Sequence, residues 1–216
     1  ALAFAEDEAA WITRKLARVP ERIVLRPGIR IPFRGADHLI VHDDEGRLPV
    51  WVEEQTATIH VGGKIEHAPR RLVDFLKREA HRAFAERTEV YAGILGVRPS
   101  RIGVRDTASR WGSCSPTRRL SFSWRLILAP PFVLDYVAAH ETAHLRAMNH
   151  GPAFWKLVRT LVDDTEAPRC WLNRNGAALH RYVVSSDERS NEVGSAMDDF
   201  GRSPKQVAGG GPPDEI

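Results

Sequence analysis

The chain contains 216 residues, of which 43% are hydrophobic and 8% aromatic, enough for one packed domain with or without an appendage. The net charge of +3 is uneven, because residues 181–216 hold four Lys/Arg and seven Asp/Glu, while the preceding 180 residues hold 27 and 21. This basic excess is too small to identify an anionic partner, two cysteines are too few for a disulfide framework, and the lack of a run of about 18 apolar residues excludes a membrane-spanning helix.

The cysteines and the start of the chain bear on the compartment. Cys114 and Cys170 fit reduced thiols, and no signal-peptide pattern opens the chain, so we expect a cytoplasmic protein without a membrane partner. The chain begins abruptly in helix-like sequence, so a removed upstream segment stays open as an alternative.

Helix and strand patterns alternate over the first 95 residues. Residues 3–19 carry apolar side chains at near-helical spacing up to Pro20, which predicts an amphipathic helix. Residues 22–61 switch to short alternating segments, such as Ile29–Phe33, and predict a small antiparallel meander. Residues 68–95 repeat apolar side chains every four positions and predict a long helix whose arginine-rich opposite face is solvated.

The next segment has strand signals on both sides of a polar loop. Residues 101–106 and 119–125 alternate apolar and polar side chains and predict a hairpin, with the loop 109–116 between them. The tandem prolines at 130–131 predict the start of a helix that runs to about Ala147, because proline is tolerated in a first turn.

Two further helices are predicted before the chain loses its apolar periodicity. Asn149–Pro152 breaks the preceding helix, a second helix carries Phe154–Val162, and a short third helix spans about Pro168–Leu179. Beyond it, Ser, Asp, Glu, Gly and Pro dominate, and such a composition cannot bury enough apolar surface to fold alone. We therefore assign residues 1–182 to one domain and residues 183–216 to a disordered acidic tail.

The helix that begins at the tandem prolines contains His140, Glu141 and His144. Residues at i and i+4 share one face of a helix, so both imidazoles can reach a single metal ion. Burying these ionisable groups on an otherwise apolar helix without a partner would cost several kcal/mol, and a metal removes that cost. We predict a Zn²⁺ site, because catalytic zinc takes nitrogen ligands in tetrahedral geometry and keeps one position open for water.

A catalytic zinc site needs a third protein ligand. His150 lies just past the predicted helix end, and Asn149 can adopt the left-handed conformation that reverses a helix terminus. The rivals are the acidic residues Glu166, Asp163 and Asp164 on the following region. Spacing favours His150, because it lies nearest to His144 in the sequence and needs only a short reversal of the chain to reach the same ion.

The predicted chemistry is hydrolysis by activated water. Zinc lowers the pKa of bound water toward neutrality, and Glu141 would act as general base and pass the proton to the leaving group. A further group should stabilise the developing oxyanion. Candidates for substrate contact are Tyr136, one helical turn before the first histidine, and Arg110 and Trp111 with the backbone N–H groups around them; Tyr136 is more simply explained as a core residue.

Several further motifs occur in one order along the chain. They are Arg110–Ser115, Trp124–Leu126 with Ala129-Pro130, Leu134–Val137, His140–Leu145, Asn149-His150 and Phe154-Trp155. Together they resemble the YgjP-like metallopeptidases, which are related to the SprT-like zinc proteases. The resemblance implies an α+β, zincin-like minimal fold, in which a small antiparallel sheet packs on helices and an HExxH helix carries zinc. It also implies that His140, His144 and His150 hold zinc and that Glu141 is catalytic, which favours His150 over its acidic rivals.

Two positions depart from the pattern of that family. Thr142 stands where relatives usually carry Leu, and Ser123 stands where many carry Asn. The first difference concerns packing behind the site, and the second concerns a substrate contact.

Three functions fit these observations. The first is a zinc metallopeptidase whose peptide or protein substrate pairs with an exposed edge of the strand 119–125. The second is a metal-dependent nucleotide phosphoanhydride or phosphoester hydrolase, because arginines suit phosphate oxygens, although a solvated basic hairpin explains the same residues. The third is a nucleic-acid-binding module with a structural zinc, which would not need the carboxylate of Glu141. We predict the metallopeptidase. The arginines on which the second function, the phosphate hydrolase, depends are Arg101, Arg105, Arg110, Arg118, Arg119 and Arg125.

Overall fold

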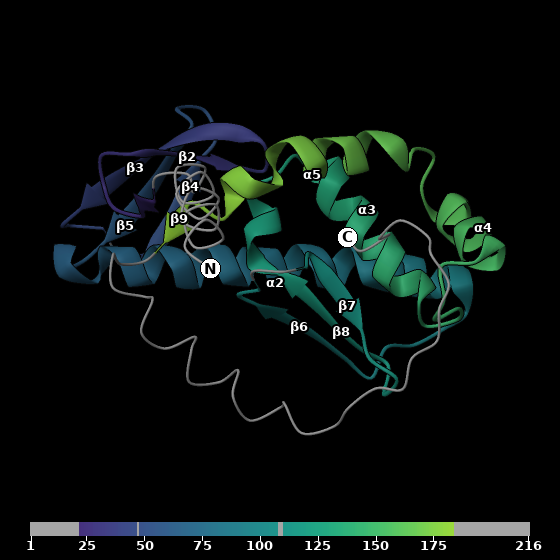
Figure 1. The fold of residues 1–216 in the computed structure, drawn as a ribbon. Coiled ribbons are helices and arrows are strands. Elements are labelled where there is room, and N and C mark those ends of the chain that lie inside the picture. The colour runs from purple at the N-terminus through teal and green to yellow at the C-terminus, as the bar shows by residue number, and fades with distance from the viewer. Residues whose placement is uncertain (1–21, 47, 108–109, 184–216) are drawn as a thin grey trace, which may run out of the picture.

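The computed structural model describes residues 22–46, 48–107 and 110–183 (Figure 1). This part of the chain is mixed α+β, with four α-helices and three small sheets. The helix predicted at residues 3–19 and the predicted tail beyond Val183 lie outside the described residues.

The first sheet is mixed rather than antiparallel. Its order is β2 (Arg30–Phe33), β3 (Ala36–Asp43), β5 (Thr58–Gly62) and β4 (Val50–Glu53). The outer pairs are antiparallel, but β3 and β5 run parallel, so the predicted meander is wrong for the central pair. Strand β5 takes the inner position because Ile59 and Val61 are fully buried, whereas the less buried β4 forms an edge.

The second sheet contains a strand that the sequence did not predict. Its order is β6 (Arg101–Arg105), β8 (Arg119–Ser123) and β7 (Gly112–Cys114). Strands β6 and β8 are parallel and β7 and β8 are antiparallel, so the predicted hairpin is wrong. The polar loop itself supplies β7, which reverses near Arg118 at a φ of 62° and occupies one side of β8. Strand β6 therefore pairs with the other side.

The long helix α2 connects the two sheets. It spans Ala68–Leu95, as predicted, after a 3₁₀ turn η1 (Ile65–His67), and ends at Gly96 in the left-handed conformation. In Figure 1 it crosses the whole molecule, with the first sheet at its amino-terminal part and the second sheet near its other half; it contacts both β5 and β6. Its apolar face thus supports both sheets.

Three shorter helices pack beside α2. They are α3 (Pro131–Ala143), α4 (Pro152–Leu161) and α5 (Glu166–Leu179). A 3₁₀ turn η2 (Trp124–Ile127) leads from β8 toward α3. Helix α3 ends earlier than predicted and contacts α2, α4, α5 and β7, so nearly all of its side chains are buried.

The third sheet joins the two ends of the described chain. Strand β1 (Ile23–Val24) pairs in parallel with β9 (Tyr182–Val183). None of the helices in the described ranges has both the length and the apolar character that a bilayer crossing requires.

Candidate metal centre

Helix α3 brings the first two predicted ligands to the middle of the molecule. His140 and Glu141 lie in its last turn and are only 2% and 3% exposed. His144 is the residue that caps the helix, and its backbone N–H donates to the carbonyl of His140 at 3.3 Å. The i, i+4 spacing thus places both imidazoles on one side of α3.

His150 returns to the same point after the helix ends. The N–H of Gly151 donates to the carbonyl of Asn149 at 2.8 Å, which tightens the turn before α4. The Nε2 atom of His150 lies 3.1 Å from the Nε2 atoms of both His140 and His144. The candidate ligand atoms of the three histidines all lie within 4.8 Å of one another. Ligands at 2.0–2.1 Å from a tetrahedral zinc would be about 3.3 Å apart, so the two distances from His150 are close to those of a zinc ligand set.

Aromatic side chains of α4 hold the three rings, a role that sequence reasoning missed. Phe154 is fully buried; its ring centroid lies 4.4 Å from that of His144 in a stacked arrangement and 4.8 Å from those of His140 and His150. Trp155 stacks on His150 at 6.0 Å. The sequence signal for this contact is that Phe154 and Trp155 follow His150 closely. Their spacing is explained equally well by ordinary core packing.

The protonation of the histidines also suits a metal. Burial, with the neighbouring His144, His150 and Arg169, lowers the pKa of His140 to about 3, and burial lowers the pKa of His144. The Nδ1 atom of His144 donates to the carbonyl of Ala147 at 3.0 Å, which leaves its Nε2 lone pair available. Metal ligation requires neutral imidazoles, so these residues fit a bound cation.

Glu141 packs directly against strand β7. A Cβ atom built on Gly112 would lie 2.6 Å from both Cγ and Oε1 of Glu141, so any larger residue at this position would require Glu141 or β7 to shift. Burial raises the pKa of Glu141 to about 8, and Arg110 opposes this rise. A carboxyl group with a pKa near neutrality suits a group that both accepts and donates protons.

These groups share one small cavity. Its volume is about 190 Å³, and it is bounded by the three histidines, Glu141 and one side of β7. Strand β7 is an edge strand, whereas β8, the strand predicted to offer its edge, lies in the centre of its sheet. The edge available beside the cavity therefore belongs to residues 112–114, and the expectation for strand 119–125 is wrong.

Comparison with known proteins identifies the family. The family described as YgjP-like, metallopeptidase domain, matches residues 1–175. The chain belongs to the YgjP-like metallopeptidase family. It is therefore a metal-dependent hydrolase, and nothing in the match supports a nucleotide or nucleic-acid partner.

The crystal structure of the metallopeptidase zymogen abylysin of Pyrococcus abyssi is similar with a TM-score of 0.39 and 22% sequence identity, over 47% of this chain and 99% of that chain. A comparison with curated proteins found no match.

Other residues that the sequence singled out in this YgjP-like chain lie in different surroundings. Arg110 lines the histidine cavity, but Trp111 packs against α5, where a Cβ on Gly176 would meet its ring at 2.9 Å, and its ring centroid lies 4.8 Å from that of His180. Tyr136 is buried, with its ring 6.0 Å from that of His140.

The acidic rivals for the third ligand position are not in the histidine group. Among the described residues, the group of potential ligands contains only the three histidines, without Glu166, Asp163 or Asp164. Glu166 instead begins α5, where its N–H donates to Asp164 at 2.8 Å.

The two positions that depart from the family pattern are both buried. Thr142 donates its hydroxyl to the carbonyl of Ala138 at 2.7 Å, within α3. Ser123 is fully buried at the end of β8, and its Oγ has no hydrogen-bond partner in the described part of the chain. Neither hydroxyl lines the histidine cavity.

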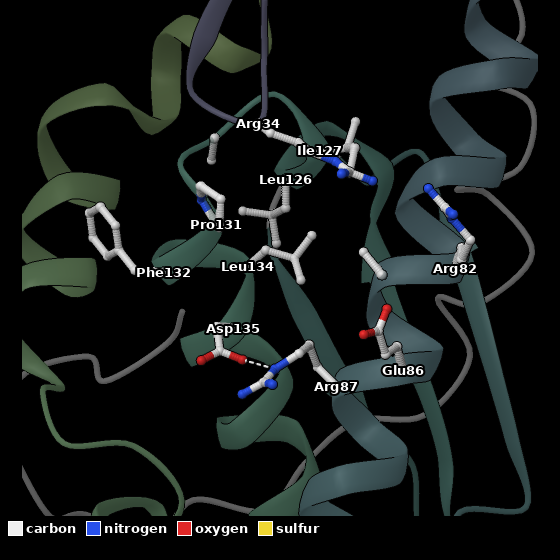
Figure 2. A pocket seen from close by; sticks show the side chains of 12 residues that line it. Arg34, Arg82, Glu86, Arg87, Leu126, Ile127, Pro131, Phe132, Leu134 and Asp135 are labelled. Atoms are coloured by element: carbon white, nitrogen blue, oxygen red, sulfur yellow. Dashed lines mark hydrogen bonds and ion pairs between the residues drawn. The ribbon is translucent and has the colours of Figure 1, made fainter. Parts of the chain in front are cut away.

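A larger cavity of about 520 Å³ lies away from this site, between α2, η2 and the start of α3 (Figure 2). Arg34, Arg82 and Arg87 border it beside apolar side chains such as Leu126, and Asp135 accepts a hydrogen bond from Arg87. It shares no lining residue with the histidine cavity, so the larger space does not mark the candidate metal centre.

Proposed function

We propose that this YgjP-like chain is a zinc-dependent metallopeptidase that hydrolyses peptide bonds, with His140, His144 and His150 as ligands and Glu141 as general base. The observation that carries the proposal is the convergence of three imidazole nitrogens and one buried carboxyl group on a single cavity. The donor set and its spacing match zinc better than cations that prefer oxygen ligands.

The roles of the protein groups follow from their positions. When bound, zinc would lower the pKa of a coordinated water and polarise the substrate carbonyl. Glu141 would accept the proton of the attacking water and return it to the leaving nitrogen. Arg110 would stabilise the developing oxyanion, because its side chain lines the histidine cavity. Its positive charge also opposes the rise in the pKa of Glu141.

An extended peptide would reach these groups along β7. In the antiparallel pair with β8, the N–H of Ser123 donates to the carbonyl of Trp111 at 2.9 Å. Because such bonds alternate along a ladder, Gly112 and Cys114 direct their backbone groups to the free edge. A substrate strand added there would lie beside Glu141.

Three broader expectations accompany this function. We propose that the fold is of the zincin-like minimal type with α3 as its active-site helix. We also propose that the metallopeptidase domain, predicted at residues 1–182, includes Val183, which pairs with Val24 in the β1–β9 sheet, and that the acidic tail predicted at 183–216 follows it. A cytoplasmic location is supported by Cys114 and Cys170, which are both unpaired thiols.

The Glu141→Gln variant tests the assignment. With zinc supplied, the wild-type protein should cleave casein or labelled peptides, and the variant should retain zinc but lose roughly 10²–10⁴-fold in kcat/KM, the usual contribution of a general base. Bound zinc is measured by atomic absorption, and nucleoside triphosphates serve as comparison substrates. Undiminished peptide cleavage by the variant, or phosphate release with no peptide cleavage by the wild type, would refute the proposal.

A further inference from the structure

A second polar cavity adjoins the candidate metal centre. Its volume is about 400 Å³, and Arg110, Gly112 and Ser113 line both this cavity and the histidine cavity. We call it the arginine cavity, because Arg105 and Arg119 also line it. Its remaining lining side chains are hydroxyl groups of Ser and Thr, and no carboxylate lines it.

The strand register explains why this face of the sheet is hollow. Ser121 lies opposite Gly103 on one side and Ser113 on the other, so a row of small residues crosses the three strands. The neighbouring Leu120 and Phe122 point the other way and are buried in the core. The row forms a shallow polar floor on the outer face.

The arginines lie at both ends of this floor. Arg105 ends β6 and Arg119 begins β8, and the two strands are parallel, so the side chains flank the row from opposite ends. Arg110 follows in the loop before β7, where Thr107 donates to its carbonyl at 2.7 Å. This arrangement offers guanidinium groups from both ends to a single bound anion.

In the described part of the chain no carboxylate forms an ion pair with the arginines of this cavity, and the buried Glu141 carboxyl of the neighbouring cavity interacts electrostatically with Arg110 alone among them. Within the described ranges, no ion pair involves Arg105, Arg110 or Arg119, whereas Asp106, the nearest acid along the chain, pairs with Arg125. Guanidinium groups beside hydroxyl donors suit carboxylate and phosphate oxygens. The chemistry of the cavity is therefore that of an anion site.

The free edge of β7 determines which residue of a bound peptide would reach the arginine cavity. Residues directly opposite each other in adjacent strands place their side chains on the same face. A peptide residue opposite Gly112 or Cys114 would therefore face the Glu141 side, and a residue opposite Ser113 would face the arginine cavity. Adjacent substrate residues would thus be divided between the two cavities.

We propose that the arginine cavity binds an anionic side chain of the peptide substrate, carried by the residue that pairs opposite Ser113; this inference rests on the proposed peptidase function. The shared chemistry is a carboxylate or a phosphate group on the peptide. The cavity thereby selects substrates with an acidic or phosphorylated residue at one fixed position near the scissile bond.

Matched peptides test this selection. Peptides that differ only by Glu or Gln at one position, moved along both sides of the scissile bond, are compared by kcat/KM, with a parallel phosphoserine and serine series to distinguish the two sources of charge. At one position the anionic peptide should be preferred roughly tenfold, the size of one charge-assisted hydrogen bond. The Arg105→Gln/Arg119→Gln double variant should reduce this preference to less than about threefold.

The control is the Arg70→Gln/Arg78→Gln double variant, which removes the same two charges from exposed sites on α2 outside both cavities and should keep the full preference. A preference near one at every position, or one unchanged in the double variant, would overturn the proposal.

A binding measurement separates this inference from the peptidase assignment. Fluorescence anisotropy with the Glu141→Gln protein should show tighter, salt-sensitive binding of the anionic peptide, which is lost when Arg105→Gln and Arg119→Gln are added. If that result appears although the wild type cleaves neither peptide, the anion site stands and the peptidase assignment falls. Equal binding of the two peptides overturns the anion site even if both are cleaved.

Discussion

Gly112 shows how closely strand β7 approaches the Glu141 carboxyl group. A methyl group at this position would overlap both Cγ and Oε1 of Glu141, and one of the two elements would have to move. Since the histidine rings are held separately by Phe154, the metal ligands need not move with the carboxyl group.

The Gly112→Ala variant should therefore lose activity and keep its metal. We expect roughly a 10²-fold decrease in kcat/KM with full zinc content, because a displacement of about 1 Å at a reacting group costs this much. Gly93→Ala on α2 is the matched control, since a Cβ there meets nothing within 4 Å. Unchanged activity of the Gly112→Ala protein would show that Glu141 tolerates displacement.

The third ligand can be tested by a second pair of variants. His150→Ala should weaken zinc binding by at least about 100-fold. The loss of a direct ligand should cost more than the loss of a residue that only hydrogen-bonds to a ligand, which typically lowers metal affinity by about 10–100-fold. Glu166→Ala should leave affinity unchanged, because Glu166 is the first residue of α5 and does not belong to the group of potential ligands formed by the histidines. Competition with a chromogenic chelator gives both values, and equal zinc retention would contradict the assignment of His150.

Sequence spacing predicted some of these residues and not others. The i, i+4 spacing placed His140 and His144 on one face without tertiary information. The contact of Gly112 with Glu141 joins distant segments, and no local pattern reports it. Trp111 was expected near the substrate because it lies in a polar loop, but it packs on α5, which local sequence could not indicate.

The pairing of α2 with α3 depends on a polar cluster at the edge of the larger cavity. Asp135 accepts hydrogen bonds from Arg87 and from the hydroxyl of Tyr91, the latter at 2.7 Å, and Arg87 also donates to that hydroxyl at 2.7 Å. Burial, reinforced by Asp135, raises the pKa of Tyr91 to about 12. The cluster joins the two helices that support the metal centre.

The Asp135→Ala variant should have a free energy of unfolding about 1–2 kcal/mol lower, because the buried Tyr91 hydroxyl loses the acceptor of its hydrogen bond. This corresponds to a decrease in Tm of roughly 2–8 °C for a domain of this size. Asp74→Ala removes an exposed carboxylate 3.8 Å from Arg70 on α2 and should cost less than about 0.5 kcal/mol. Equal thermal unfolding of the two variants, followed by circular dichroism, would contradict this role.

Single elements were predicted better than their pairing. Helix α2 has the predicted bounds because apolar periodicity and a terminal glycine are local signals. The parallel pairs β3–β5 and β6–β8 were missed, because pairing depends on which strand the rest of the fold buries. Strand β7 was assigned to a loop, since its three small residues carry no alternation of apolar side chains.

Metal binding should stabilise the whole described fold. The three histidines belong to α3 and the turn before α4, so a bound cation links segments that other contacts already bury. Zinc at about 100 times its Kd should contribute about 2.7 kcal/mol, and thus raise Tm by roughly 5–10 °C.

Differential scanning calorimetry with zinc and after chelation measures this effect. His144→Ala should lose most of the zinc-dependent increase in Tm, and His81→Ala, an exposed residue of α2, should keep it. The same increase in the His144→Ala protein would indicate that zinc acts elsewhere.

The pairing of β1 with β9 has a consequence for synthesis on the ribosome. Ile23 has its partner in Tyr182, which emerges only after every helix of the described fold has been made. Contacts between such distant segments form late and slowly. Strand β1 therefore lacks its partner until almost all of residues 22–183 have been made, and we expect the β1–β9 pair to be the last of the described sheets to form.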